Sequence, residues 1–145
     1  IKEQSESNIT KKLVINNISI NSKFIKKNDV FFAIKGKKID GNIFVSEALK
    51  KKSCLAIVNQ KNINYPKSKQ IKVDNTLNFL TKCSSIFREN INAKIISITG
   101  SCGKTTLKEM IGLTLKRLSK TTYSPKSFNN KYGVPLSLFN LKQND

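Results

Sequence analysis

The sequence predicts an α/β fold, because short apolar runs alternate with segments whose apolar residues have helical spacing. Two of the runs, Val30–Ile34 and Leu55–Val58, have the length and composition of buried parallel strands. Between them, Phe44–Lys51 has the spacing of a short helix. A third run, Lys94–Thr99, leads through a glycine-bracketed loop into a helical pattern over Thr105–Leu118. We therefore expect a small front α/β domain, followed by the first strand, loop and helix of a second α/β domain.

The same patterns indicate the remaining elements of the front domain. Further short strands are expected at Leu13–Ile15, Ile18–Ile20 and Ile71–Val73. Asp74 or Asn75 is placed to cap a helix over Thr76–Arg88, because short polar side chains accept hydrogen bonds from first-turn N–H groups. The expected buried face of that helix consists of Leu77, Leu80, Cys83, Ser84 and Phe87. Residues 89–93 then form a connection, so the domains are expected at 1–90 and 91–145.

The loop after Lys94–Thr99 has the composition of a phosphate-binding loop. Residues 99–106 are Thr-Gly-Ser-Cys-Gly-Lys-Thr-Thr. Such a loop wraps backbone N–H groups around a polyphosphate, while the lysine meets the outer phosphate oxygens and the next hydroxyl ligates Mg²⁺. The pattern indicates a nucleoside triphosphate as ligand and phosphoryl transfer as reaction class. The residues assigned to the nucleotide are Gly100, Ser101, Cys102, Gly103, Lys104, Thr105 and Thr106.

Individual side chains of this loop have distinct expected roles. Lys104 would neutralise phosphate charge and is the catalytic candidate, and Thr105 would hold Mg²⁺. Thr106 would support the phosphates or start the helix. The alternative is an ordinary glycine turn with Lys104 in solvent. The flanking strand and helix patterns favour the phosphate loop, although Ile98 stands where the longer form of the motif has a glycine.

A second motif lies at residues 127–135, which are Ser-Phe-Asn-Asn-Lys-Tyr-Gly-Val-Pro. Its asparagines and glycine are typical of a polar turn, and Pro135 fits the first turn of a following helix. From spacing alone, a turn without further function is the favoured interpretation.

Residues 99–106 and 128–135 together resemble the Mur ligase family, the ATP-dependent amide-forming enzymes of peptidoglycan synthesis. The second segment is similar to the branch that joins D-alanyl-D-alanine to UDP-N-acetylmuramoyl-tripeptide. Lys26–Gly36 and Ile39–Phe44 are similar to stretches of the family's front domain. The resemblance covers about residues 12–141, in the expected order.

The resemblance implies a reaction and its cofactors. ATP, with Mg²⁺, would phosphorylate the terminal carboxylate of UDP-N-acetylmuramoyl-tripeptide, and the amine of D-alanyl-D-alanine would attack the acyl phosphate. Asn129 and Asn130 would lie beside the nucleotide and the substrate. The family has three domains and needs a metal-binding glutamate, a modified lysine and adenine-binding residues further along. The chain is therefore expected to be a truncated part that binds nucleotide weakly at best and does not ligate alone.

In the front domain, the resemblance assigns the uridine diphosphate to Ser22, Lys23, Gly41 and Asn42. This motif departs from the family pattern. Lys23 replaces an arginine, which exchanges a bidentate guanidinium for a point charge. Asn42 replaces a histidine, and Cys102 replaces an asparagine common in the phosphate loop.

The composition is strongly basic, with a net charge of +18. This charge raises the possibility of nucleic-acid binding. The lysines are scattered, however, and only two arginines occur, so we expect no nucleic-acid partner. Histidine is absent, and Cys54, Cys83 and Cys102 lack disulfide or metal spacing. With no signal peptide and no apolar run long enough for a bilayer, we expect a cytoplasmic protein without membrane insertion. We also expect a monomer.

Three other functions stay open from the sequence. One is a sister Mur ligase, and another is an enzyme similar to folylpolyglutamate synthase, which lacks a front domain like residues 12–88. The third is a basic module that uses Gly100–Thr106 only as an anion site for nucleic acid. The residues do not identify the third amino acid of the tripeptide.

Overall fold

The computed structural model describes residues 13–125 and 130–141. The chain divides into two compact units, between Leu80 and Thr81, inside helix α2 (Thr76–Glu89). The sequence places the domain boundary slightly later, at residues 89–93. Within the described ranges, no helix is long and apolar enough to cross a bilayer.

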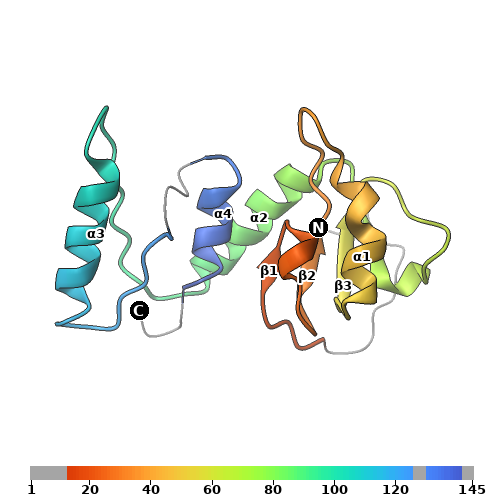
Figure 1. Ribbon diagram of the computed structural model, residues 1–145. Coiled ribbons are helices and arrows are strands. Elements are labelled where there is room, and N and C mark those ends of the chain that lie inside the picture. Colours follow the sequence, from red (N-terminus) through yellow and green to blue (C-terminus); the bar gives the residue numbers. More distant parts are fainter. Residues whose placement is uncertain (1–12, 126–129, 142–145) are drawn as a thin grey trace. The chain divides into compact units, whose positions relative to one another are not determined.

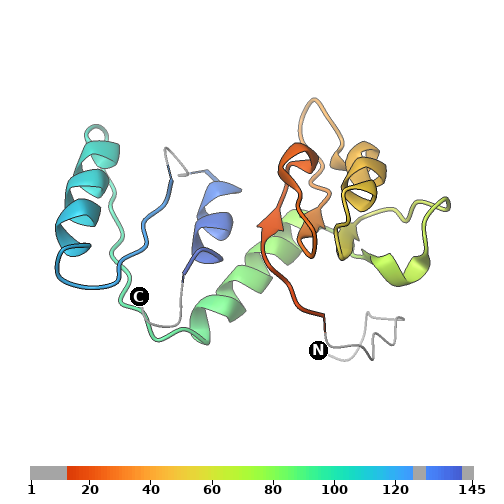
Figure 2. The ribbon, with the colours of Figure 1, turned by 60° about the horizontal axis from the view of Figure 1, so that its bottom comes forward.

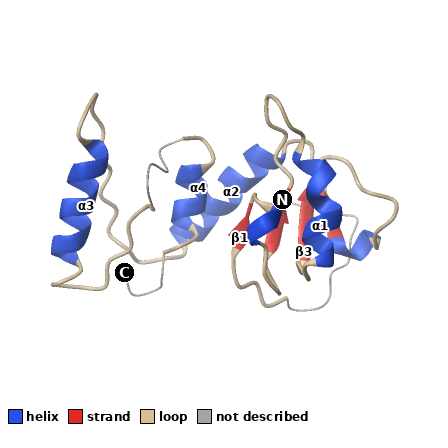
Figure 3. Cartoon of the chain, in the orientation of Figure 1, coloured by secondary structure: helices blue, strands red, loops and turns tan. Residues whose placement is uncertain are grey.

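The first unit is built on a four-stranded parallel sheet in the order β1-β2-β3-β4 (Figures 1 and 3). The strands are β1 (Ile18–Ser19), β2 (Val30–Phe32), β3 (Leu55–Val58) and β4 (Gln70–Lys72). This sheet confirms the predicted α/β class. The strand predicted at Leu13–Ile15 is wrong, because these side chains are exposed and pairing starts only beyond them, where Asn16 N–H donates to the carbonyl of Asn28.

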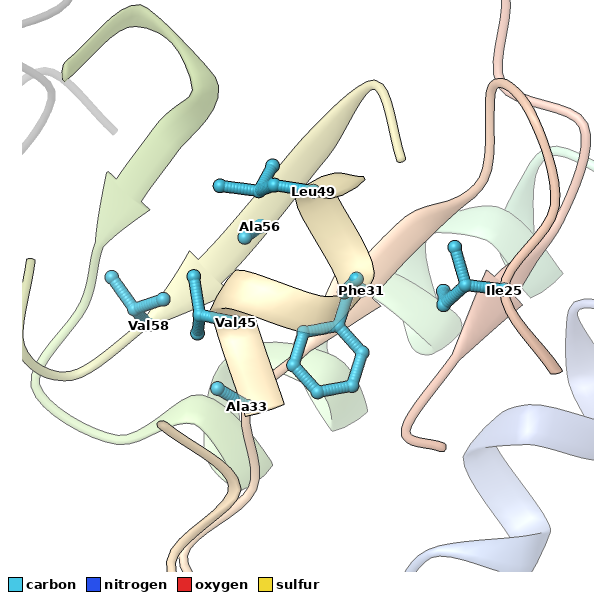
Figure 4. Packing of buried hydrophobic residues seen from close by; sticks show 8 residues of the cluster. Ile25, Phe31, Ala33, Val45, Leu49, Ala56 and Val58 are labelled. Carbon is cyan, nitrogen blue, oxygen red and sulfur yellow. The ribbon is translucent and has the colours of Figure 1, made fainter. Parts of the chain in front are cut away.

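The main core lies between the sheet and helix α1 (Val45–Lys50), which follows a 3₁₀ helix, η2 (Gly41–Phe44). Figure 4 shows Phe31 and Ala56 of the sheet packed with Val45 and Leu49 of α1. The complete buried cluster is Ile25, Phe31, Ala33, Val45, Ala48, Leu49, Ala56 and Val58. The helix predicted at Phe44–Lys51 is thereby confirmed, with its first residue inside the 3₁₀ turn.

The opposite face of the sheet receives the start of α2. Successive strand residues point to opposite faces, so Phe32 faces away from Phe31 and its ring stacks on Phe79, with centroids 6.2 Å apart. The Thr76 hydroxyl donates to the carbonyl of Ala33 at 3.0 Å. Asn75 is the predicted cap, since its Oδ1 accepts from the N–H of Asn78 at 2.9 Å.

The second unit contains α3 (Lys104–Leu115) and α4 (Gly133–Leu138). The strand predicted at Lys94–Thr99 is wrong, because this segment is extended but carries no strand (Figure 3). A strand is defined by hydrogen bonds to a neighbouring strand, and no described segment of this unit supplies one. The helix predicted at Thr105–Leu118 is confirmed in position but ends at Leu115.

The apolar side of α3 is only partly covered. Leu107 and Met110 are 48% and 62% exposed, although the sequence predicts them on a buried face. Half-buried Ile111 and Leu115 line a hollow of about 700 Å³, together with residues 92–96, Ile98 and part of α4. Leu107 and Met110 lie outside this lining and stay exposed, because a helix stripe becomes buried only when another layer packs on it.

Gly41 provides a test of this fold. Its N–H donates to the carbonyl of Ile34 at 2.9 Å, and a Cβ at Gly41 would lie 2.7 Å from the backbone N and O of Ile34. We predict that Gly41→Ala lowers the free energy of unfolding of the first unit by about 1–3 kcal/mol, since the backbone must move apart.

Urea unfolding followed by circular dichroism measures this change. Gly36→Ala is the matched control, because its Cβ would meet a single backbone atom at 3.0 Å, the carbonyl oxygen of Ile39. Equal destabilisation by the two variants would contradict the packing argument.

Candidate functional site

The loop before α3 bends at two glycines. Gly100 has φ +149° and Gly103 has φ +76°, a region of backbone conformation that favours glycine. A Cβ built on Gly103 would meet no atom within 4 Å. Ser101 and Cys102 are exposed. The bend is therefore exposed to solvent on its outer side.

The first turn of α3 presents backbone donors beside this bend. The first N–H groups of any helix have no partner within the helix. Gly103 occupies the N-cap position of α3 without a side-chain cap, and the first turn contains no acidic residue. The partial positive charge of the helix end is thus available to an anion. The side chains of Thr105 and Thr106 are exposed at the same place.

Lys104 turns back over the loop. Its Nζ donates to the carbonyl of Gly100 and, at 3.1 Å, to that of Ser101. The ammonium therefore lies on the loop, where a phosphate could replace the carbonyls as its acceptor. Both hydrogen bonds lie at the exposed surface of the loop.

Asn130 has a structural task in the second unit. Its Oδ1 accepts from the backbone N–H groups of Tyr132 at 3.0 Å and Gly133 at 2.8 Å, at the start of α4. The side-chain oxygen is thus occupied, and the amide nitrogen is the group with which Asn130 could reach a ligand. Asn129 lies outside the described residues.

The substrate residues predicted in the front domain are also engaged in internal contacts. Ser22 is buried at the start of the 3₁₀ helix η1 (Ser22–Phe24), and its hydroxyl donates to Glu47 Oε2 at 2.6 Å. Lys51 Nζ pairs with Glu47 Oε1 at 2.8 Å and donates to the carbonyls of Ser22 and Lys23. The pKa of the Glu47 carboxyl is lowered most by the hydrogen bond from Lys51 and next by the hydrogen bond from Ser22. The Lys23 side chain is exposed.

A second polar cluster surrounds Asn42. Its Nδ2 donates to Asp40 Oδ1 at 2.6 Å and to Asn59 Oδ1. The pKa of the Asp40 carboxyl is lowered most by the hydrogen bond from the Asn42 backbone N–H and next by the hydrogen bond from the Asn42 side chain. The Oδ1 of Asn42 is buried and, among the described residues, has no hydrogen-bond partner. Such an acceptor is costly to leave unpaired, so a ligand donor here would be favoured.

Both groups of residues predicted to bind substrate in the front domain lie in 3₁₀ helices that pack against α1. Ser22 and Lys23 are in η1, and Gly41 and Asn42 are in η2. Glu47, Lys51 and Asn59 are polar partners that sequence reasoning missed. The spacing of Glu47 and Lys51 on one helix was a usable signal. Asn59 directly follows β3, at the carboxyl end of the strand, where ligands of α/β folds commonly bind.

Comparison with known proteins identifies the family. The chain matches the Mur ligase family, catalytic domain, over residues 14–88, which is just over half of its length. The chain belongs to the Mur ligase family. Residues 98–145 match the Mur ligase middle domain.

Relatives of this Mur ligase chain include a UDP-N-acetylmuramoyl-tripeptide–D-alanyl-D-alanine ligase from Buchnera aphidicola subsp. Acyrthosiphon pisum. It is 44% identical over 131 residues, which are 90% of this chain and 28% of the relative. The solved UDP-N-acetylmuramoylalanyl-D-glutamyl-2,6-diaminopimelate–D-alanyl-D-alanyl ligase from Acinetobacter baumannii is 34% identical, with a TM-score of 0.81 over 90% of this chain and 29% of that one. The Mur ligase chain thus spans less than a third of the length of the relatives it matches.

A third similar protein was solved with a nucleotide. The MurF ligase from Thermotoga maritima in complex with ADP is 33% identical, with a TM-score of 0.76. The match covers 89% of this Mur ligase chain and 30% of that one.

The three thiols of the chain are predicted to differ in reactivity. Cys102 is exposed on the loop, whereas Cys54 and Cys83 are partly covered, and burial raises the pKa of both of these thiols. Because the thiolate is the nucleophile, iodoacetamide at pH 8 should alkylate Cys102 about tenfold faster or more. Peptide mass spectrometry against time measures the rates, and Cys102→Ser should remove the fast phase. Equal rates at all three cysteines would contradict the described exposure of the loop.

Proposed function

We propose that this chain contributes the uridine-nucleotide side and the start of the ATP site to a ligase that joins D-alanyl-D-alanine to UDP-N-acetylmuramoyl-tripeptide. The observation that carries the proposal is the open loop before α3, where two glycines at positive φ, an uncapped helix end and the Lys104 ammonium converge. A similar protein of this type was solved with ADP. The reaction class is amide formation through an acyl phosphate at the expense of ATP.

At the ATP site, Lys104 would exchange its carbonyl acceptors for phosphate oxygens and so neutralise charge during phosphoryl transfer. Mg²⁺ would be held by the Thr105 hydroxyl together with phosphate oxygens and water, a ligand set that suits this ion. The described residues contain no cluster of three acidic, histidine or cysteine side chains that could hold a metal instead. Asn130, with Asn129, would orient nucleotide and substrate through amide hydrogen bonds.

We assign residues 1–90 to the substrate domain and 91–145 to part of the ATP-binding domain of a longer protein. The share of its relatives that the chain spans and the uncovered apolar side of α3 support this division. In the substrate domain, Lys23 and Asn42 are the side chains best placed for uridine diphosphate, since Ser22 is committed to Glu47. Gly41 would contribute its backbone. The ligase would work as a cytoplasmic monomer.

A basic nucleic-acid-binding module is the second candidate, favoured by the net charge of +18. Lys104→Ala separates the two functions. We predict that it weakens Mg²⁺-dependent ATP binding about tenfold or more, because a hydrogen bond from a charged donor is lost. Retention on DNA or RNA should not change.

Equilibrium dialysis with labelled ATP and filter binding with nucleic acid measure these effects. Lys82→Ala is the control, because it removes the same charge from an exposed site on α2. Unchanged ATP binding with loss of nucleic-acid retention would support the binding module and overturn the ligase.

The 145-residue polypeptide by itself should not form the amide product. Its nucleotide loop is preceded by a segment that is not paired in a sheet, and α3 is covered on one side only. A phosphoryl-transfer site needs closer positioning of its groups than this support provides. Chromatography of mixtures with ATP, Mg²⁺ and both substrates tests this expectation. Product formed at a rate proportional to the amount of chain would refute it.

A further inference from the structure

The loops that enter strands β2, β3 and β4 meet at one edge of the sheet in the first unit. Val30, the first residue of β2, pairs with Leu55, the first residue of β3. Gln70, the first residue of β4, pairs with Ala56. The three parallel strands therefore begin side by side, and we call this side the amino edge. Asn59, which follows β3, lies at the opposite, carboxyl edge.

Exposed lysines gather along the amino edge, two from each entering loop. The N–H of Asn28 donates to the carbonyl of Lys52 at 3.2 Å, which joins the loops before β2 and β3. Neighbouring strands lie about 4.8 Å apart, so three of them span about 10 Å, about one Debye length at 0.1 M salt. The charges at this edge therefore act together. We call these lysines the amino-edge patch: Lys26, Lys27, Lys50, Lys52, Lys67 and Lys69, all exposed.

The carboxylates near the amino-edge patch are engaged elsewhere. Asp29 is buried, and its Oδ2 accepts from the backbone N–H of Lys26 at 2.8 Å. Glu47 Oε1 is paired with Lys51 at 2.8 Å. Among the residues that the structure describes, no ion pair involves a lysine of the patch. The patch thus presents excess positive charge over a broad surface, which suits an extended anionic partner.

An aromatic side chain is exposed beside the amino-edge patch. Phe24 is 74% exposed in η1, two residues before Lys26. Figure 2 shows η1 next to α1, as in Figure 1, and the two pack together. Lys51 Nζ also ties the end of α1 to η1, because it donates to the carbonyls of Ser22 and Lys23 at 3.2 Å each. The Phe24 ring and the ammonium groups are therefore available to one partner.

We propose that the amino-edge patch and Phe24 bind an anionic lipid surface, as a peripheral contact without insertion of a helix. A polybasic patch and an apolar anchor are two signals that together give stable attachment to a membrane surface. Nucleic acid is the weaker alternative, because arginine is the better reader of phosphates and bases and residues 1–80 contain none. The proposal does not depend on the ATP site, which belongs to the second unit.

Phe24→Trp tests the contact directly, because the chain contains no tryptophan of its own. With vesicles of phosphatidylglycerol and phosphatidylcholine in equal parts, the emission should shift to the blue and the full chain should sediment with the vesicles. Vesicles of phosphatidylcholine alone, or about 0.5 M salt, should abolish both signals, because the attraction between charges is lost. Unshifted emission on the anionic vesicles would overturn the proposal.

A triple variant, Lys26→Gln with Lys27→Gln and Lys50→Gln, tests the patch itself. It should weaken sedimentation with the anionic vesicles about 100-fold, since each lysine near such a surface contributes about fivefold. The matched control should weaken it about threefold or less. That control removes the same number of exposed lysines from the loop after β2, at the carboxyl edge: Lys35→Gln, Lys37→Gln and Lys38→Gln.

Thermal melting followed by circular dichroism establishes that both triple variants fold. Equal losses of vesicle binding in the two would show that net charge, and not the amino-edge patch, is responsible, and would overturn the proposal. Retention on single-stranded RNA is measured in parallel. Unchanged vesicle binding with loss of RNA retention in the patch variant would assign the surface to nucleic acid instead.

Discussion

The uncapped amino end of α3 is the constraint on which the functional argument depends. Its first N–H groups have no acceptor within the helix, and the N-cap residue, Gly103, has no side chain that could accept their hydrogen bonds. Gly100 and Gly103 bend the chain so that Lys104 returns over the same loop. The positive end of the helix dipole and an ammonium therefore lie at one bend of backbone. This combination favours a polyphosphate over a neutral ligand.

The two units differ in how far their apolar surfaces are covered. In the first unit, helices lie on both faces of a parallel sheet, and Phe31 and Leu80 are fully buried. In the second unit, Ile96 and Met110 are more than half exposed, and Ile96 lines a hollow of about 700 Å³. The first unit thus has a completed core, whereas the second unit has a formed loop on a partly covered helix. This contrast agrees with the share of its Mur ligase relatives that the chain spans.

The sequence predicted correctly those elements that depend on neighbouring residues, such as one buried strand and one helix cap. Strand β3 was found at its predicted bounds, and all four of its apolar residues are buried, as expected for a parallel strand. The cap at Asn75 follows from its side chain. Residues 94–99 were predicted as a strand that did not form, since strand pairing depends on distant partners. The contacts of Ser22 with Glu47 and of Lys108 with Ser124 were also missed, because they join residues 25 and 16 positions apart.

Amide resonances of the chain during titration with Mg²⁺·ATP test the central claim most directly. The account predicts that the N–H signals of residues 100–106 shift first and most strongly, because their donors meet the phosphates. Adenosine, which has no phosphate, should leave them in place. Unmoved signals in this loop at saturating ATP, or shifts spread over lysine-rich surface elsewhere, would contradict it.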